Sequence, residues 1–83
     1  MTRRKPQHAP DSLVIQTLLF DRDEFSRDEA KHWAKTHGFR YGKVHTTATM
    51  HRLRQEDPAL YRKGTFATFT LRPYVQAVAG KLR

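Results

Sequence analysis

The chain has 83 residues, enough for one small domain with a modest core. It carries 16 lysines and arginines against 8 acidic residues, a net charge of +8. It has no cysteine, which excludes disulfides, thiolate metal sites and a cysteine nucleophile, and its longest apolar run, residues 13–20, is too short to cross a bilayer.

The two signs of charge are unevenly distributed along the chain. Six of the eight acidic residues come before residue 30, whereas eleven of the sixteen basic residues come after residue 29. The asymmetry indicates an acidic end and a basic face. A basic face is typical of proteins that bind nucleic acid, another polyanion or an acidic protein surface. A surface that only keeps a small protein soluble is the alternative.

The first residues differ in character from the rest. Residues 1–11 are polar, hold two prolines and show no apolar periodicity, so we expect a disordered basic arm. Residues 12–83 then form a single domain. This domain begins with residues 12–20, whose β-branched and large apolar side chains predict a buried strand that is apolar on both faces.

The segment that follows predicts a helix over residues 27–37. Ser26 is placed to be its N-cap, and Glu29 lies three residues later, as a capping box requires. Gly38 fits the left-handed position after the helix, with Phe39 folding back in a Schellman ending. A helix of about three turns is not stable alone, so its apolar stripe, and above all the tryptophan, must pack on a sheet. The stripe consists of Ala30, Trp33, Ala34 and His37.

Three further elements complete the prediction. Residues 43–54 are β-like, but their alternation changes phase past Met50, which predicts either a bulge or two short strands. Residues 65–71 predict a strand that pairs antiparallel with 43–54 through a long loop. Residues 74–82 favour a short terminal helix over a strand, because their apolar residues have helical spacing. These residues are Val75, Val78, Ala79 and Leu82.

Together these elements predict an α+β fold, in which a small, mainly antiparallel sheet packs on one well-capped helix. The order of residues from Phe20 to Leu82 also resembles a small uncharacterised domain encoded by bacteriophages and prophages, found near head-maturation genes. The shared series is Phe-Asp, Phe-Ser, an Ala and a Trp in the helix, His-Gly-Phe, Lys-Val, Arg-x-Arg-Gln, Asp-Pro, Lys-Gly, Phe-x-Thr and Val-x-Ala-Val-x-Gly. The matching residues are Phe20, Asp21, Phe25, Ser26, Ala30, Trp33, His37, Gly38, Phe39, Lys43, Val44, Arg52, Arg54, Gln55, Asp57, Pro58, Lys63, Gly64, Phe66, Thr68, Val75, Ala77, Val78 and Gly80.

The resemblance implies a phage protein that works in the host cytoplasm or in the virion, and it implies no particular activity. The chain departs from the pattern in three places. Met50 and His51 stand where the relatives tend to carry aromatic residues. His45 to Thr47 replace residues that tend to be acidic in the relatives, which makes this surface more basic. Pro73 and Tyr74 stand where the relatives have glycine.

The sharpest polar cluster is Arg52, Arg54 and Gln55. On a strand the two arginines point the same way, roughly 7 Å apart, and two guanidinium groups on one face can clamp phosphate or carboxylate groups. Alternatively, one of them pairs with Glu56, with Asp57 or with the acidic start of the helix. The basic residues that we expect to contact nucleic acid are Arg40, Lys43, Arg52, Arg54, Arg62 and Lys63.

Aromatic residues interleaved with basic ones suit the stacking of single-stranded bases. The candidates for stacking are Tyr41, Tyr61, Phe69 and Tyr74. The remaining large rings are better explained as core, and these are Trp33, Phe39 and Phe66.

Catalytic and metal-binding patterns do not emerge from the sequence. The carboxylates around Asp23 lack the glycine and the glutamate of an EF-hand loop, and the five histidines lack zinc spacing. We therefore expect no cofactor, no metal and no enzymatic activity. The expected function is a non-catalytic binding module that contacts nucleic acid or another polyanion through a basic face. The alternative is a protein-interaction role in virion assembly or in the inhibition of a host protein. The sequence leaves the oligomeric state and the choice between DNA and RNA open.

Overall fold

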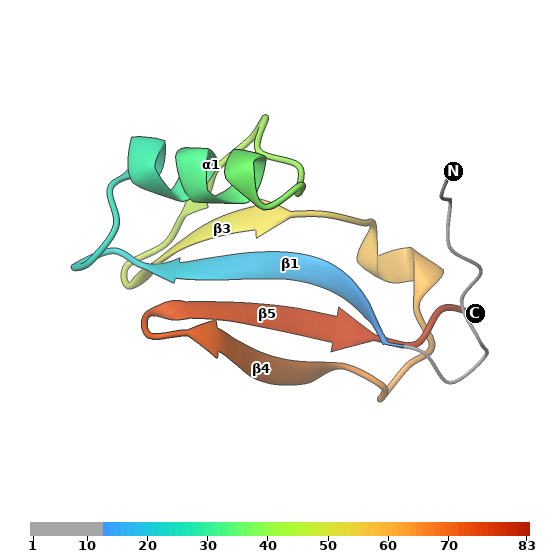
Figure 1. Cartoon of the computed structure of the whole chain (residues 1–83). Coiled ribbons are helices and arrows are strands. Elements are labelled where there is room, and N and C mark those ends of the chain that lie inside the picture. Colours follow the sequence, from blue (N-terminus) through green and yellow to red (C-terminus); the bar gives the residue numbers. More distant parts are fainter. Residues whose placement is uncertain (1–12) are drawn as a thin grey trace.

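The computed structural model describes residues 13–83, so the arm predicted at residues 1–11 and the predicted first strand residue, Ser12, lie outside the described range. One helix packs against a five-stranded antiparallel sheet, which confirms the predicted α+β class (Figure 1). The elements in chain order are β1 (Val14–Asp21), α1 (Arg27–Thr36), β2 (His45–Thr46), β3 (Met50–Arg54), the 3-10 turn η1 (Pro58–Leu60), β4 (Ala67–Arg72) and β5 (Val75–Gly80).

Helix α1 begins and ends as its sequence predicts. The Ser26 hydroxyl accepts a hydrogen bond from the Glu29 amide at 3.1 Å, and the Glu29 carboxylate accepts one from the Ser26 amide at 2.8 Å. At the other end, Gly38 has φ +81° and the Phe39 amide donates to the Ala34 carbonyl at 2.8 Å. Both predicted caps, the capping box and the Schellman ending, are therefore confirmed.

The helix is attached to the sheet through small residues and one large ring. Ala30 and Ala34 are fully buried, and the half-buried Trp33 meets Phe20 of β1 edge-on, with 5.6 Å between ring centroids. The predicted packing through Trp33 is confirmed. His37, which we expected on the same apolar stripe, is exposed and stacks on the outer side of Trp33 at 3.8 Å.

The strand order is β2-β3-β1-β5-β4. Because β3 is antiparallel to both β1 and β2, the strands β1 and β2 run parallel to each other on either side of β3. The unit β1-α1-β2 is therefore a split βαβ motif, with β3 inserted between its two strands. The run 43–54 is two short strands joined by a turn, one of the two predicted alternatives. The predicted pairing of 65–71 with 43–54 is wrong, because β4 pairs with β5 and two strands separate it from β3.

The prediction of a terminal helix at residues 74–82 is also wrong, because Val75–Gly80 forms β5. Its place beside the central strand β1 buries Val75, Ala77 and Ala79 on one face, with the less buried residues between them. Burial at alternate positions outweighs the coincidental helical spacing of the valines and alanines. Pro73 and Tyr74, with φ +70° at Tyr74, form the tight turn that returns the chain from β4.

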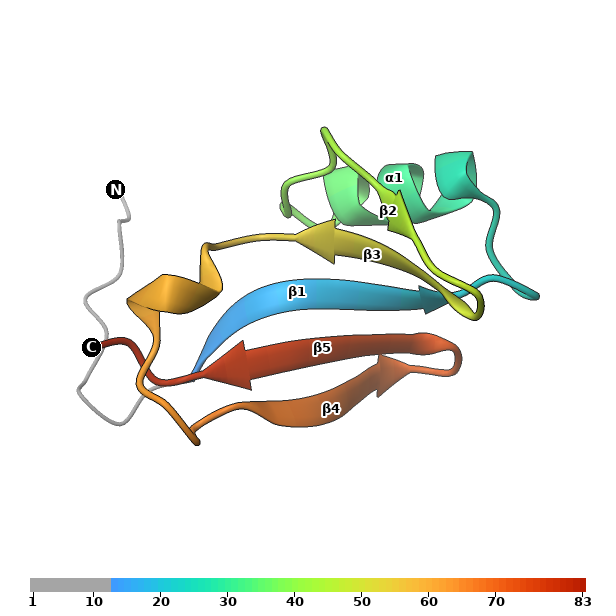
Figure 2. The ribbon, with the colours of Figure 1, turned by 180° about the vertical axis from the view of Figure 1, so that it is seen from behind.

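The two faces of the sheet differ in what covers them. On the helix side lie Leu18, Phe20, Leu53, Val75 and Ala77, which with Ala30 and Ala34 form the core. In both Figures 1 and 2, α1 lies on the β3 and β1 side of the molecule, and β4 is the strand farthest from it. Within residues 13–83, no α-helix covers the opposite face. Among residues 13–83, no helix has the length and apolar character needed to cross a membrane.

Candidate nucleic-acid interface

The open face of the sheet is shaped by a β-bulge in β1. Ile15 pairs with Ala79 and Thr17 with Val78, so that Gln16 is an extra residue in the β1 strand. The Gln16 carbonyl accepts hydrogen bonds from the amides of residues 55 and 56, and its side-chain amide donates to the Glu56 carbonyl at 2.9 Å. A bulge bends its strand and increases the local twist, so one end of the open face becomes concave.

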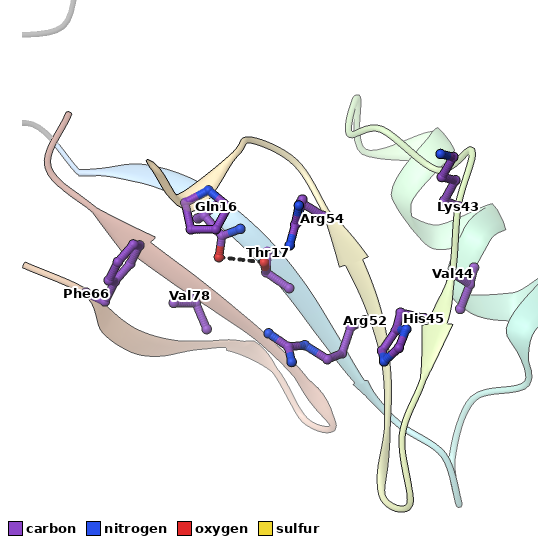
Figure 3. A pocket seen from close by; sticks show the side chains of 10 residues that line it. Gln16, Thr17, Lys43, Val44, His45, Arg52, Arg54, Phe66 and Val78 are labelled. Carbon is purple, nitrogen blue, oxygen red and sulfur yellow. Dashed lines mark hydrogen bonds between the residues drawn. The ribbon is translucent and has the colours of Figure 1, made fainter. Parts of the chain in front are cut away.

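This concavity, the basic groove, has a volume of about 750 Å³. Its floor is formed by β1 and β5, one wall by β2 and β3, and the other wall by Phe66 (Figure 3). The lining residues include four with basic side chains and none with a carboxylate. The groove is lined by Gln16, Thr17, Lys43, Val44, His45, Arg52, Arg54, Pro58, Phe66 and Val78.

Arg52 and Arg54 lie on the same face of β3, as their spacing predicts. Arg54 is opposite Thr17 and Arg52 is opposite Leu19 of β1. Figure 3 shows the Arg52 side chain reaching from β3 toward Val78 of β5. Both arginines are exposed, and within residues 13–83 neither guanidinium has a hydrogen-bond or ion-pair partner. Their charges are therefore open to a ligand.

The alternative that these arginines pair with nearby carboxylates is wrong within the described range. Glu56 lies 3.8 Å from the Arg40 guanidinium instead. The Asp57 carboxylate accepts a hydrogen bond from the Ala59 amide at 2.9 Å and caps η1. Both acidic residues next in sequence to β3 are thus directed away from the groove lining.

The β2 wall is positioned by a buried glutamine. The Gln55 side chain accepts from the Arg40 amide at 2.7 Å and donates to the Arg40 carbonyl at 2.9 Å. These bonds tie the loop after α1 to the end of β3, and that loop delivers Lys43 and His45 to the groove. Gln55, which the sequence grouped with Arg52 and Arg54, therefore has a structural role and lies buried.

Phe66 forms the far wall, and its ring packs on the buried Tyr61, which does not itself line the groove. Tyr61 is 2% exposed and its hydroxyl donates to the Ile15 carbonyl at 3.2 Å, whereas Phe66 is 42% exposed and lies 5.2 Å from Tyr61 between ring centroids. Burial, and secondarily the charge of Glu56, raises the pKa of Tyr61 above its ordinary value of 10.0. Gly80 makes room for both rings, because a Cβ there would lie 2.9 Å from Tyr61 Cδ2 and 3.0 Å from Phe66 Cδ1.

The six predicted contact residues separate into two groups. Lys43, Arg52 and Arg54 line the groove. Arg40 is exposed on the loop after α1 and pairs with Glu56. The other two, Arg62 and Lys63, are exposed on the loop between η1 and β4 and are absent from the groove lining.

The aromatic predictions also separate. Tyr61, a predicted stacking residue, is a core residue, and Phe66, a predicted core residue, is exposed in the groove. Tyr61 forms a β-bridge with Leu82, and its hydroxyl donates to the Ile15 carbonyl, so its ring is held inside the fold. Trp33 and Phe39 are half-buried against the core, as predicted. The remaining stacking candidates are exposed outside the groove, and these are Tyr41, Phe69 and Tyr74.

The sequence reasoning missed His45, Gln16, Thr17 and Val78 as groove residues. The sequence could have indicated His45, because it lies two residues after Lys43 and therefore points to the same side of a strand. The sequence could not have indicated Gln16, Thr17 and Val78, because only the bulge in β1 and the pairing of β5 with β1 bring these residues together. Among the described residues, no group of three histidine or acidic side chains could hold a metal ion. No protein-family model, curated protein or solved structure matches the chain.

Proposed function

We propose that this protein is a non-catalytic binding module that holds single-stranded nucleic acid in the basic groove on the open face of its sheet. The observation that carries the proposal is the charge of the groove. Lys43, Arg52, Arg54 and His45 line it, no carboxylate does, and the two guanidinium groups have no partner within residues 13–83. Guanidinium forks are well suited to phosphate oxygens.

The shape of the site favours a single strand over a duplex. The cations line the inside of a concavity, where a flexible backbone can follow them. In the part of the chain that the structure describes, no helix or β-ribbon projects from this face to enter a duplex groove. Phe66 offers a half-exposed ring beside Val78, and base stacking on such rings is the usual second component of single-strand binding. Thr17 and Gln16 add polar groups at the floor.

The resemblance of residues 20–82 to phage-encoded domains adds a setting to this proposal, the host cytoplasm or the virion. A second candidate uses the same groove differently. An acidic protein surface presents carboxylates that the same guanidinium groups would bind, in virion assembly or in the inhibition of a host protein. The two functions differ in the partner, and therefore in their response to salt and to nuclease.

The test is fluorescence anisotropy with a labelled single-stranded oligonucleotide at several salt concentrations. The double variant Arg52→Ala/Arg54→Ala should lose affinity, and its log–log salt slope should fall by about 0.7 for each phosphate contact removed. The matched control is Arg62→Ala/Lys63→Ala, which removes the same two charges from outside the groove. It should bind nearly as tightly as the unchanged protein.

A third variant separates stacking from charge. Phe66→Ala should weaken binding by about 1–3 kcal/mol for a stacked base while leaving the salt slope unchanged. Equal losses in the two charge-matched double variants would show that the groove is not the site. Binding to a lysate protein that resists both salt and nuclease, with no oligonucleotide binding, would replace this proposal by the protein-interaction candidate.

A further inference from the structure

The two edges of the sheet are built differently. At one edge, β2 has only two residues and follows Lys43, and a very short strand with a nearby charge is a common protection against pairing with another chain. At the other edge, β4 has six residues and no partner strand on its outer side among residues 13–83. The stretch 65–71, which includes all of β4 except Arg72, contains no charged residue and no proline. Only the last residues of β4 are irregular, at the register shift between Thr70 and Arg72.

The side chains of β4 are also uncovered. All six of its residues are exposed, including Phe69 at 41% and Leu71 at 42%. Phe69 pairs with Ala77 and Ala67 with Ala79, so both lie on the helix side of the sheet and extend the apolar face outward from the core. Helix α1 does not reach them, because it lies on the β3 and β1 side (Figures 1 and 2).

Charged residues are nearly absent from this edge, because β4 carries only Arg72, at its end. A protein with a net charge of +8 repels its own copies over most of its surface, but the stretch 65–71 is neutral. The nearest charge, Arg72, is drawn over the Phe25 ring at 5.8 Å. An unpaired strand edge is a template for another strand, and this one offers the least repulsion to a strand of the same sequence.

We propose that β4 pairs antiparallel with β4 of a second copy across a two-fold axis perpendicular to the sheet, so that one sheet runs through both copies. Antiparallel partners point to the same side of a sheet. With the axis at Phe69, this residue opposes Phe69 of the second copy, and Thr68 opposes Thr70. Apolar side chains then meet on the helix side and threonines meet on the open side, and both basic grooves face the same way.

The affinity of this dimer should be modest. Two six-residue edges form a small interface, so we expect a dissociation constant of about 1–100 µM. Sedimentation equilibrium of the full chain, after nuclease treatment and at high salt, measures it. The average mass should rise with concentration from 9.8 kDa toward twice that value. Phe69→Lys sets two like charges against each other and should weaken the dimer at least about tenfold. Leu60→Lys adds the same charge at a 51% exposed residue of η1 and should change nothing.

The absence of cysteine allows a direct test of the pairing. Thr68→Cys mixed with Thr70→Cys should form a disulfide dimer on mild oxidation, whereas Ala48→Cys, exposed between β2 and β3, should stay monomeric. A mass of 9.8 kDa up to about 500 µM, well above the expected constant, would overturn the proposal. So would a dimer that Phe69→Lys leaves intact while that variant keeps its melting midpoint, or cross-linking of Ala48→Cys equal to that on β4.

Discussion

Replacing Gly80 by alanine should destabilise the fold even though alanine is the better strand residue. A Cβ at this position would lie 2.9 Å from Tyr61 Cδ2, 3.0 Å from Phe66 Cδ1 and 3.2 Å from Phe66 Cε1, closer than carbon atoms normally approach. Phe66 is half-exposed and can rotate outward. Tyr61 cannot easily follow, because it is buried and its hydroxyl is bonded to the Ile15 carbonyl.

The magnitude combines two opposing effects. Forcing an extra carbon into a packed site costs about 1–3 kcal/mol, and alanine recovers about 0.5–1 kcal/mol through its smaller backbone entropy in a strand. At the centres of these two ranges, the net loss should be about 1 kcal/mol. With a urea dependence of about 1 kcal/mol per molar, typical at the small end of the range, the midpoint should fall by about 1 M.

Gly42→Ala is the matched control, because an added Cβ there meets no atom within 4 Å. Urea titrations of both variants, followed by circular dichroism, give the comparison. The double variant Gly80→Ala/Phe66→Ala should lose less than the sum of the two single changes, since removing one ring relieves part of the clash. Equal midpoints for Gly80→Ala and Gly42→Ala would refute the close packing at the far wall of the groove.

Three further changes test the fold. Trp33→Ala should lower the free energy of unfolding by about 2–4 kcal/mol, which is less than the range of about 3–5 kcal/mol for a fully buried ring because Trp33 is half-buried. A urea melt that shows a loss below about 1 kcal/mol would contradict the packing of Trp33 on Phe20. Tyr74→Gly should raise stability by about 1 kcal/mol, because Tyr74 holds φ +70° in an exposed turn, and an unchanged or lower midpoint would argue against strain there. Because the pKa of Tyr61 is raised in the folded state, the stability that its neutral hydroxyl contributes is fully present below about pH 10 and is lost as the pH rises through the folded pKa. Above about pH 10, the free energy of unfolding should therefore decline less steeply in Tyr61→Phe than in the unchanged protein. Parallel slopes in the two proteins would contradict that assignment.

Local interactions explain which parts of the fold could be predicted. The caps of α1 involve residues three to five apart, such as Ser26 with Glu29 and Phe39 with Ala34, so the sequence contains both partners of each hydrogen bond. The phase change past Met50 likewise marks the turn between β2 and β3 within a few residues. The spacing of Arg52 and Arg54 placed them on one face of a strand, and the structure has them there.

The groove could be predicted only in part. Charge predicted Lys43, Arg52 and Arg54 as contact residues, but charge alone did not distinguish them from Arg40, Arg62 and Lys63. Which of these basic residues line the groove depends on where the connecting loops join the strands. Gln55 anchors the backbone of Arg40, and the bridge between Tyr61 and Leu82 holds the neighbouring loop beside the end of β5.

The sequence by itself determined the α+β class, the helix with both its ends, and the excess of basic charge in the second part of the chain, because each depends on neighbours along the chain or on composition. Only the tertiary structure decided that residues 75–80 are a strand, that β1 separates the two hairpins, and that Phe66 faces the groove while Tyr61 is buried. The apolar residues of this stretch fit a helix through Val75, Val78 and Ala79 and fit a strand through Val75, Ala77 and Ala79. What selects the strand is the edge of β1, more than fifty residues earlier in the chain. Pairing between segments so far apart leaves no local pattern, since the hydrogen bonds that fix it join backbones whose chemistry is the same at every residue.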